Sequence, residues 1–180
     1  GNGERLAKRY GDEIRHCPEL APKEGLGSWL VWNGRHWAAD ATMAVQEMAK
    51  ETVRAIALET PPDIEKKIDK NGVVSDGKNW TLEWAKKSEE ARRIKNMVEM
   101  ARSISTLQSA AEEYDGHPYL LNVLNGTLDL GDGSIRPAER NDYLTQCAGV
   151  DYDPEATCPT WDKFMLDCMD GKQHLVEYHQ

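Results

Sequence analysis

The chain has 180 residues, of which 39% are hydrophobic and 29% charged, with a formal net charge of −9. This length suffices for one domain with a core, or for a domain with an appendage, and the composition is typical of a globular protein. The acidic balance argues against a surface that binds polyanions everywhere, and the absence of both a run of about 18 apolar residues and an apolar signal core favours a cytoplasmic protein.

The first predicted elements are a short helix and a β-hairpin. The segment GNGERLAKRYG predicts a helix that stops at Gly11. In WLVWNGRHW, residues 29–37, Asn33 and Gly34 stand between apolar residues. This pattern predicts two strands joined by a type I′ turn, because Asn and Gly tolerate positive φ. Thr42 is expected to cap the helix that follows. The apolar residues of that helix recur at helical spacing: Val45, Met48, Ala49, Val53, Ile56 and Ala57.

The middle of the chain predicts a polar connection and a long helix. Thr60-Pro61-Pro62 ends the preceding helix, and residues 62–79 are a polar connection with one helical turn at most. The longest helix is predicted from Thr81 to Arg102. Its apolar stripe comprises Ala91, Ile94, Val98 and Ala101, widened by Met97, Met100 and Ile104. The segment Ser109–Glu112 has the spacing of a capping box and predicts a further short helix.

The segment LLNVLNGTLDLGDG, residues 120–133, predicts a small β-meander. Strands over 120–124 and 127–130 are joined at Asn125-Gly126, and a turn at 131–133 leads into a third strand over 134–137. Residues 143–150 are expected to be extended, 151–161 to form a loop, and a helix to begin near Thr160 or Trp161. The predicted fold class is α+β, mainly helical, with helices packed against short antiparallel hairpins, because strand–helix–strand repeats are absent.

The sequence contains no recognisable catalytic or metal-binding motif. A phosphate loop, GxxxxGK[ST], is absent from residues 120–133 and from the Asp-Gly-Lys segments at 76–78 and 170–172. A calcium loop starting at Asp129 fails because Gly131 and Gly133 fall where oxygen ligands belong. The four cysteines are unevenly spaced, so neither disulfides nor a zinc site is expected, although His16 and Cys17 are adjacent. We therefore predict no catalytic residue, no metal and no cofactor within this chain.

One segment has a net positive charge, although the chain as a whole is acidic. Residues 86–102 contain six basic and three acidic residues, whereas only four lysines and arginines follow Leu107. Because basic side chains attract DNA phosphates without sequence preference, five residues are candidate nucleic-acid contacts: Lys86, Lys87, Arg92, Arg93 and Lys95. The alternative is a solvated helix face with ion pairs at helical spacing, such as Glu89 with Arg93.

Six tryptophans are many for this length. Most are expected to fill the core. Trp32 and Trp37 flank the predicted hairpin turn, which makes them candidates for exposure, and for stacking on bases or contacting a protein partner.

Three stretches in this order resemble the poxvirus primase–helicase N-terminal-like domain of phage and plasmid primase–helicases. They are WAKKSEEARRIKNMVEMARS (84–103), LLNVLNGTLDLGDGSIRP (120–137) and VDYDPEATCPTWDKFM (150–165); the start and the tryptophan-rich hairpin are also similar. The resemblance implies a domain over 1–155, with residues 156–180 starting the helical connection into a superfamily-three helicase. On this interpretation the glycine-bearing turns of 120–133 shape a hairpin and bind no phosphate.

The resemblance also implies a function in DNA replication. The chain would be a non-catalytic module that links primase and helicase parts of one parent protein, helps to assemble a homo-oligomeric ring and guides single-stranded DNA. ATP and Mg²⁺ would belong to the helicase domain, outside this chain. Two alternatives stay open, namely an adaptor that binds proteins without touching DNA and a metal-dependent nuclease. Salt-dependent DNA binding distinguishes the first function from the adaptor, and activity with magnesium would reveal the nuclease.

Overall fold

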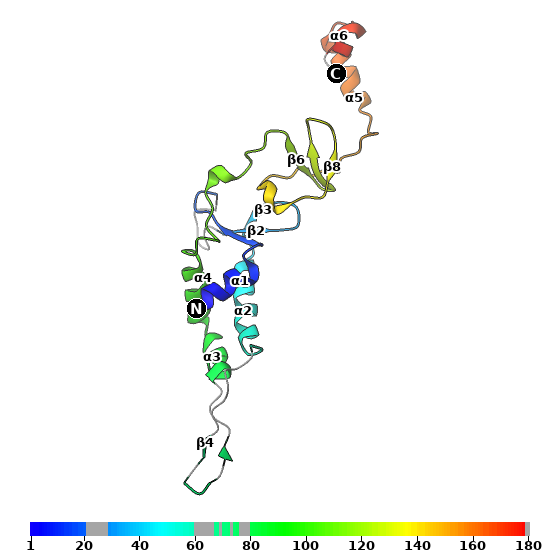
Figure 1. Ribbon diagram of the computed structural model, residues 1–180. Coiled ribbons are helices and arrows are strands. Elements are labelled where there is room, and N and C mark those ends of the chain that lie inside the picture. The colour runs from blue at the N-terminus through cyan, green and yellow to red at the C-terminus, as the bar shows by residue number, and fades with distance from the viewer. Residues whose placement is uncertain (21–28, 60–66, 69, 73, 76–79, 179–180) are drawn as a thin grey trace.

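The computed structural model describes residues 1–20, 29–59, 67–68, 70–72, 74–75 and 80–178. Helices and strands alternate along an elongated molecule (Figure 1). The elements are α1 (Asn2–Tyr10), β1 (Ile14–His16), β2 (Trp29–Trp32), β3 (Trp37–Ala39), α2 (Ala44–Ile56), β4 (Lys67–Ile68), β5 (Val74–Ser75), α3 (Trp80–Ser88), α4 (Ala91–Ala101), β6 (Leu120–Val123), β7 (Gly126–Asp129), β8 (Ile135–Arg136), α5 (Pro159–Cys168) and α6 (Gln173–Tyr178), with 3-10 turns η1 (Ala111–Glu113) and η2 (Arg140–Asp142).

The α+β prediction is confirmed. Strands β1-β2-β3 form one antiparallel sheet and β6-β7-β8 another, while β4 and β5 pair as a two-stranded ribbon. The helices α1, α2 and α4 pack on one another and on the first sheet, and the second sheet lies further along the molecule, followed by α5 and α6 (Figure 1). The ribbon falls within the connection for which at most a helical turn was expected, so that expectation is wrong. The predicted helix stop at Thr60-Pro61-Pro62 lies outside the described residues.

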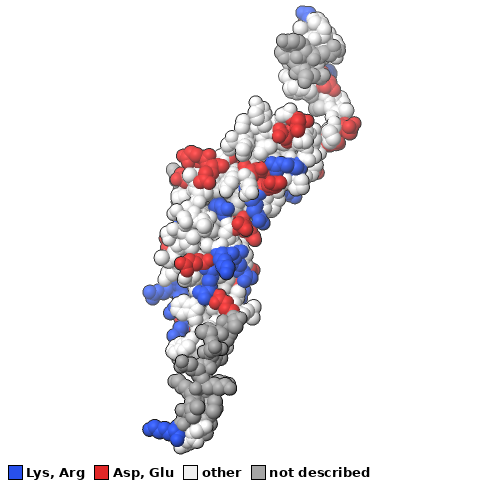
Figure 2. All heavy atoms as spheres, viewed as in Figure 1, with Lys and Arg blue, Asp and Glu red and all other residues white. Residues whose placement is uncertain are grey.

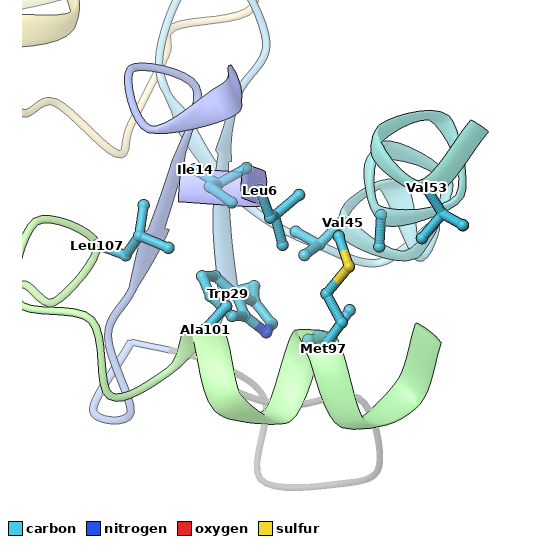
Figure 3. Packing of buried hydrophobic residues seen from close by; sticks show 10 residues of the cluster. Leu6, Ile14, Trp29, Val45, Val53, Met97, Ala101 and Leu107 are labelled. Atoms are coloured by element: carbon cyan, nitrogen blue, oxygen red, sulfur yellow. The ribbon is translucent and has the colours of Figure 1, made fainter. Parts of the chain in front are cut away.

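The main core lies where α1, α2 and α4 meet the first sheet (Figure 3). Leu6 of α1, Val53 of α2 and Ala101 of α4 are fully buried, and Trp29 of β2 is 2% exposed. Figure 3 shows Leu6, Val45 and Met97 converging from three different helices. Each helix contributes one apolar stripe, and burial of these stripes against one another supplies the main driving force for folding.

A second, aromatic cluster joins the first sheet to the chain that leads into the second. Trp37 of β3 is 1% exposed, and its ring lies 6.5 Å from the ring of Tyr114 and 6.4 Å from that of Tyr143. Its Nε1 donates a hydrogen bond to the carbonyl oxygen of Arg140 at 2.9 Å. The expected exposure of Trp37 is therefore wrong, because segments more than 70 residues away in the sequence cover the hairpin.

The expected single helix from Thr81 to Arg102 is also wrong. The chain breaks at Glu90, which has φ −58° and ψ 131°, so that α3 and α4 are separate helices. Just before the break, the fully buried Ser88 accepts a hydrogen bond from the side-chain amide of Asn2 in α1 at 3.0 Å. A contact with a distant helix thus accompanies the end of α3, where the local sequence favours a continuous helix.

The hairpin turns differ from the prediction in detail. Four residues, 33–36, connect β2 and β3, and only Gly34 among them has positive φ, at 93°. The side-chain oxygen of Asn33 accepts the backbone N–H groups of Arg35 and His36, both at 3.0 Å, which closes the loop as an Asx turn. In the second sheet the turn lies at residues 124–125, and Gly126 already belongs to β7.

The remaining elements follow the prediction closely. Helix α1 ends at Tyr10, α2 covers the expected apolar residues except Ala57, which is its exposed C-cap, and α5 begins at Pro159, one residue from the expected start. The short helix after Ser109 is a single 3-10 turn, capped by Glu113, whose carboxylate accepts the N–H of Ala110 at 2.8 Å. Residues 143–150 form no strand; they run beside β6, where Ala148 donates its N–H to the carbonyl of Asn122 at 2.8 Å.

Asp40, rather than Thr42, caps helix α2. Its carboxylate oxygens accept the N–H groups of Ala44 at 2.8 Å and Val45 at 3.0 Å. We predict that Asp40→Ala lowers the free energy of unfolding by about 1 kcal/mol, because two helix-terminal N–H groups lose their acceptor. Thr42→Ala, which removes no hydrogen bond, should change it by less than about 0.5 kcal/mol. Urea titrations followed by circular dichroism measure both; equal losses would contradict the assignment.

Candidate nucleic-acid interface

The five predicted DNA contacts do not form one continuous strip. Lys86 and Lys87 lie exposed in the last turn of α3, where they complement the negative end of the helix dipole. Arg92, Arg93 and Lys95 lie on α4, beyond the break between the helices. The structure therefore divides the candidates into two groups on two helices.

Arg93 is engaged with neighbouring side chains. Its Nε lies 3.3 Å from a carboxylate oxygen of Glu90, and its guanidinium carbon lies 5.4 Å from the centre of the Trp84 ring. The partner is Glu90, not the Glu89 that helical spacing suggested. Arg93 is half-buried, whereas Arg92 and Lys95 are exposed. Within the described part of the chain, no ion pair or hydrogen bond holds the side chain of either Arg92 or Lys95.

Lys95 lines a groove between α2 and α4. The groove has a volume of about 430 Å³ and contains two further basic residues, Lys50 and Arg54, from α2. Gln46, Glu89, Ala91 and Ile94 complete its lining. Lys50 also forms an ion pair with Glu47, and this hydrogen bond lowers the pKa of the Glu47 carboxyl. Three cations thus border one groove, and among the described residues neither Arg54 nor Lys95 forms an ion pair with a carboxylate.

Lys50 and Arg54 were missed by the sequence analysis. Their spacing of four residues places them on one face of α2, which from sequence alone is simply the polar side of an amphipathic helix. Only the packing of α2 against α4 brings this face beside Lys95. The sequence shows that Lys50 and Arg54 share the polar face of one helix, but it does not show that this face lies beside Lys95.

Helix α1 adds a second basic surface. Arg5, Lys8 and Arg9 line a shallow groove against α2. The guanidinium of Arg5 is held at 2.7 and 2.8 Å by the carboxylate of Glu59, and this hydrogen bond lowers the pKa of Glu59. Figure 2 shows basic side chains gathered over the region of α1 and α2, with acidic ones among them. Arg5 is therefore neutralised locally, and Lys8 and Arg9 in the last turn of α1 remain exposed.

Trp32 lies in a different environment from Trp37. It is partly exposed and lines a polar hollow with Arg15 and Arg140. Asp12, Ala138, Glu139 and Asn141 form the rest of this hollow. The ring centre of Trp32 lies 5.8 Å from that of the buried Trp37, and the two rings are tilted relative to each other. Of the two tryptophans selected from the sequence, only Trp32 presents a ring to which another aromatic group could bind.

The glycine-bearing turn between β7 and β8 does not fit a phosphate group. The side chain of Asp129 accepts the N–H of Gly131, and that of Asp132 accepts the N–H of Ser134, both at 2.8 Å. Carboxylates thus occupy backbone donors that a phosphate loop would offer to its ligand. The side chain of Ser134, and after it the backbone N–H of Ser134, lowers the pKa of the Asp132 carboxyl by hydrogen bonding.

No metal centre is evident in the described ranges. No three His, Cys, Asp or Glu side chains there gather closely enough to hold an ion. The neighbouring residues His16 and Cys17 lie in different environments. Cys17 is buried, and burial raises the pKa of its thiol; His16 lies edge-on to Trp29 at 5.2 Å, and burial lowers its pKa. In the same ranges, no helix is both long and apolar enough to cross a membrane.

Comparison with models of known protein families shows which family the chain belongs to. The family described as D5 N terminal like matches residues 3–170 of the chain. The chain is a member of the D5 N terminal like family. This domain occurs in phage and poxvirus primase–helicase proteins, so the resemblance drawn from residues 84–165 is confirmed. No curated protein matches the chain. Membership places this D5 N terminal like chain in the context of primase–helicase proteins, which is a replication context.

Proposed function

We propose that this D5 N terminal like chain is a non-catalytic module of a phage- or plasmid-type replication primase–helicase, and that it guides single-stranded DNA between the primase and helicase parts. The observation that carries the DNA-binding part is the basic groove between α2 and α4, where Lys50, Arg54 and Lys95 converge. Phosphates attract such cations without sequence preference. The parent protein would work in the cytoplasm of a bacterial or phage-infected cell.

Further candidate contacts lie outside this groove. Arg92 is exposed on α4, while Lys86 and Lys87 lie at the end of α3. Trp32 offers its ring to a base, with Arg15 and Arg140 beside it. Because 14 acidic and only four basic residues follow Leu107, binding should be weak and should run mainly through residues before Leu107.

The chain also supports the assembly of subunits into a ring within the parent protein. ATP hydrolysis with Mg²⁺ would belong to a superfamily-three helicase domain elsewhere in that protein. Residues 156–180, which include α5 and α6, would begin the connection to it. The basic groove favours contact with DNA over an adaptor that binds only proteins, and no observation among the described residues favours the metal-dependent nuclease.

The test is a titration of labelled single-stranded DNA at several salt concentrations. We expect Arg54→Ala/Lys95→Ala to weaken binding about tenfold at low salt and to reduce the slope of log affinity against log salt by about two, because each lost phosphate contact removes about one unit. Lys163→Ala/Lys172→Ala is the charge-matched control and should bind as the wild type does. Arg92→Ala/Arg93→Ala should have a smaller effect, which comes from Arg92. Wild-type chain that binds no DNA at low salt, or a control that binds as weakly as the groove variant, would contradict the proposal.

A further inference from the structure

The outward face of α5 is an aromatic surface without a partner in the described chain. Trp161 is 52% exposed and Phe164 54% exposed, and their ring centres lie 5.6 Å apart on adjacent turns. Met165 and Leu166 of α5, and Met169 just after it, are partly buried, and α5 packs against α6. Exposed aromatic pairs are rare on the surface of a helix that has nothing to bind, and are typical of the anchors of protein interfaces.

An apolar groove of about 540 Å³ lies between α1, α3 and α4. Its floor and walls include Trp84 of α3, Met97 and Met100 of α4, and Ile104. Met100 is 65% exposed and Trp84 42% exposed, so the groove presents large apolar side chains to solvent. Flexible methionine side chains adapt readily to an aromatic partner.

The two surfaces differ in charge. Helix α5 carries Asp162 and Asp167 near the aromatic pair, with Lys163 between Asp162 and Phe164, and residues 108–180 contain 14 acidic and four basic residues. The groove lining contains Glu4 and Arg93, and Arg93 is paired with Glu90. The exposed cations Arg92, Lys86 and Lys87 lie on α4 and α3, outside the lining. Residues 86–102, which include the α4 wall of the groove, have six basic and three acidic residues, against four basic and 14 acidic over 108–180. This regional difference in charge favours an approach of the α5 end of one copy to the helical end of another.

The two surfaces also lie far apart. Figure 1 shows α5 beyond the sheet β6-β7-β8, while α3 and α4 lie on the other side of the first sheet. One copy of the chain in this conformation therefore cannot bring α5 to its own groove. A second copy can.

We propose that the Trp161–Phe164 face of α5 docks into the Trp84–Met100 groove of a second copy of the chain, head to tail. Such an interface uses a different surface on each partner, and it continues from copy to copy until a ring closes or a filament grows. The inference rests on the assembly part of the proposed function and gives that part its residues. Because the contact is small, we expect weak association, with a dissociation constant of about 0.1 mM.

Analytical ultracentrifugation of the whole chain over a concentration series tests the proposal. The mean mass of wild type should rise with concentration, and both Met100→Asp and Phe164→Asp should stay monomeric. The native residues are exposed, so neither substitution removes a core side chain. Leu130→Asp is the matched control: it also adds a carboxylate to an exposed apolar position in the acidic half, and it should associate as wild type does.

A mixture of the two monomeric variants gives the decisive result. The Met100→Asp copy still has an intact α5 and the Phe164→Asp copy still has an intact groove, so together they should form dimers that grow no further. A mixture that stays monomeric, or single variants that associate like wild type, would overturn the proposal. DNA titrations with the monomeric Phe164→Asp variant separate the two claims. If Phe164→Asp binds DNA but does not associate, both the DNA contact and the self-association are supported. If Arg54→Ala/Lys95→Ala associates normally but binds DNA as wild type does, only the proposed DNA contact fails.

Discussion

Trp37→Ala should destabilise the chain by about 3–5 kcal/mol, the usual cost of removing a large buried aromatic side chain. Trp37 is 1% exposed and contacts the rings of Tyr114 and Tyr143. Its Nε1 hydrogen bond to the carbonyl oxygen of Arg140 is also lost. The indole joins β3 to two segments that lead into and out of the second sheet. A cavity there should therefore loosen the connection between the two sheets, and equilibrium urea unfolding monitored by circular dichroism measures the loss.

Trp32→Ala is the matched control. Trp32 lies opposite Trp37 in the same hairpin but is partly exposed, so we expect a loss below about 1.5 kcal/mol. Its effect should appear in DNA affinity instead, because base stacking on an aromatic ring contributes about 1–3 kcal/mol. The conservative Trp37→Phe, tested where it remains folded, should bind DNA as wild type does. Similar unfolding free energies for Trp32→Ala and Trp37→Ala would contradict this division of roles.

Gly126→Ala should destabilise the second sheet by about 3 kcal/mol. Gly126 opens β7 at φ 155°, and a methyl group added there would lie 2.4 Å from the carbonyl oxygen of Arg136 and 3.1 Å from Cγ1 of Ile135 in β8. The carbonyl belongs to the backbone of a paired strand and cannot move without breaking that pairing. We expect a lower urea midpoint, and faster hydrogen exchange at the amides of β7 and β8.

Two other glycines separate the causes of this effect. Gly34→Ala keeps the strain of a positive φ of 93° but meets open space, so it should cost about 1–2 kcal/mol. Gly149 has neither positive φ nor an atom within 4 Å of an added methyl, and Gly149→Ala should change stability by less than about 0.5 kcal/mol. If Gly126→Ala cost no more than Gly149→Ala, the close approach of β7 and β8 would not be a constraint on the sequence.

Local sequence patterns determined where most elements lie. Alternating apolar residues around Asn33-Gly34 predict the hairpin of β2 and β3, and the 3.6-residue period predicts α2 and its buried face. The segment 120–133 predicts the second sheet because its strands are consecutive and its turns are short. The family, too, could be inferred from the order of three short stretches. These features depend on neighbours in sequence, which is why they could be predicted.

The tertiary structure decided what depends on distant neighbours. Residues 81–102 favour one helix locally, but a hydrogen bond from Asn2 to the buried Ser88 accompanies its division into α3 and α4. Trp32 and Trp37 are equivalent in the hairpin, and only coverage by Tyr114 and Tyr143 buries one of them. The candidate site changed for the same reason. Lys95 was visible in the sequence, but Lys50 and Arg54 join it across a groove only because buried apolar stripes press α2 against α4. Hydrophobic burial is non-directional and acts between any faces that meet, so a helix's own sequence shows which face is buried but not which cations lie beside it.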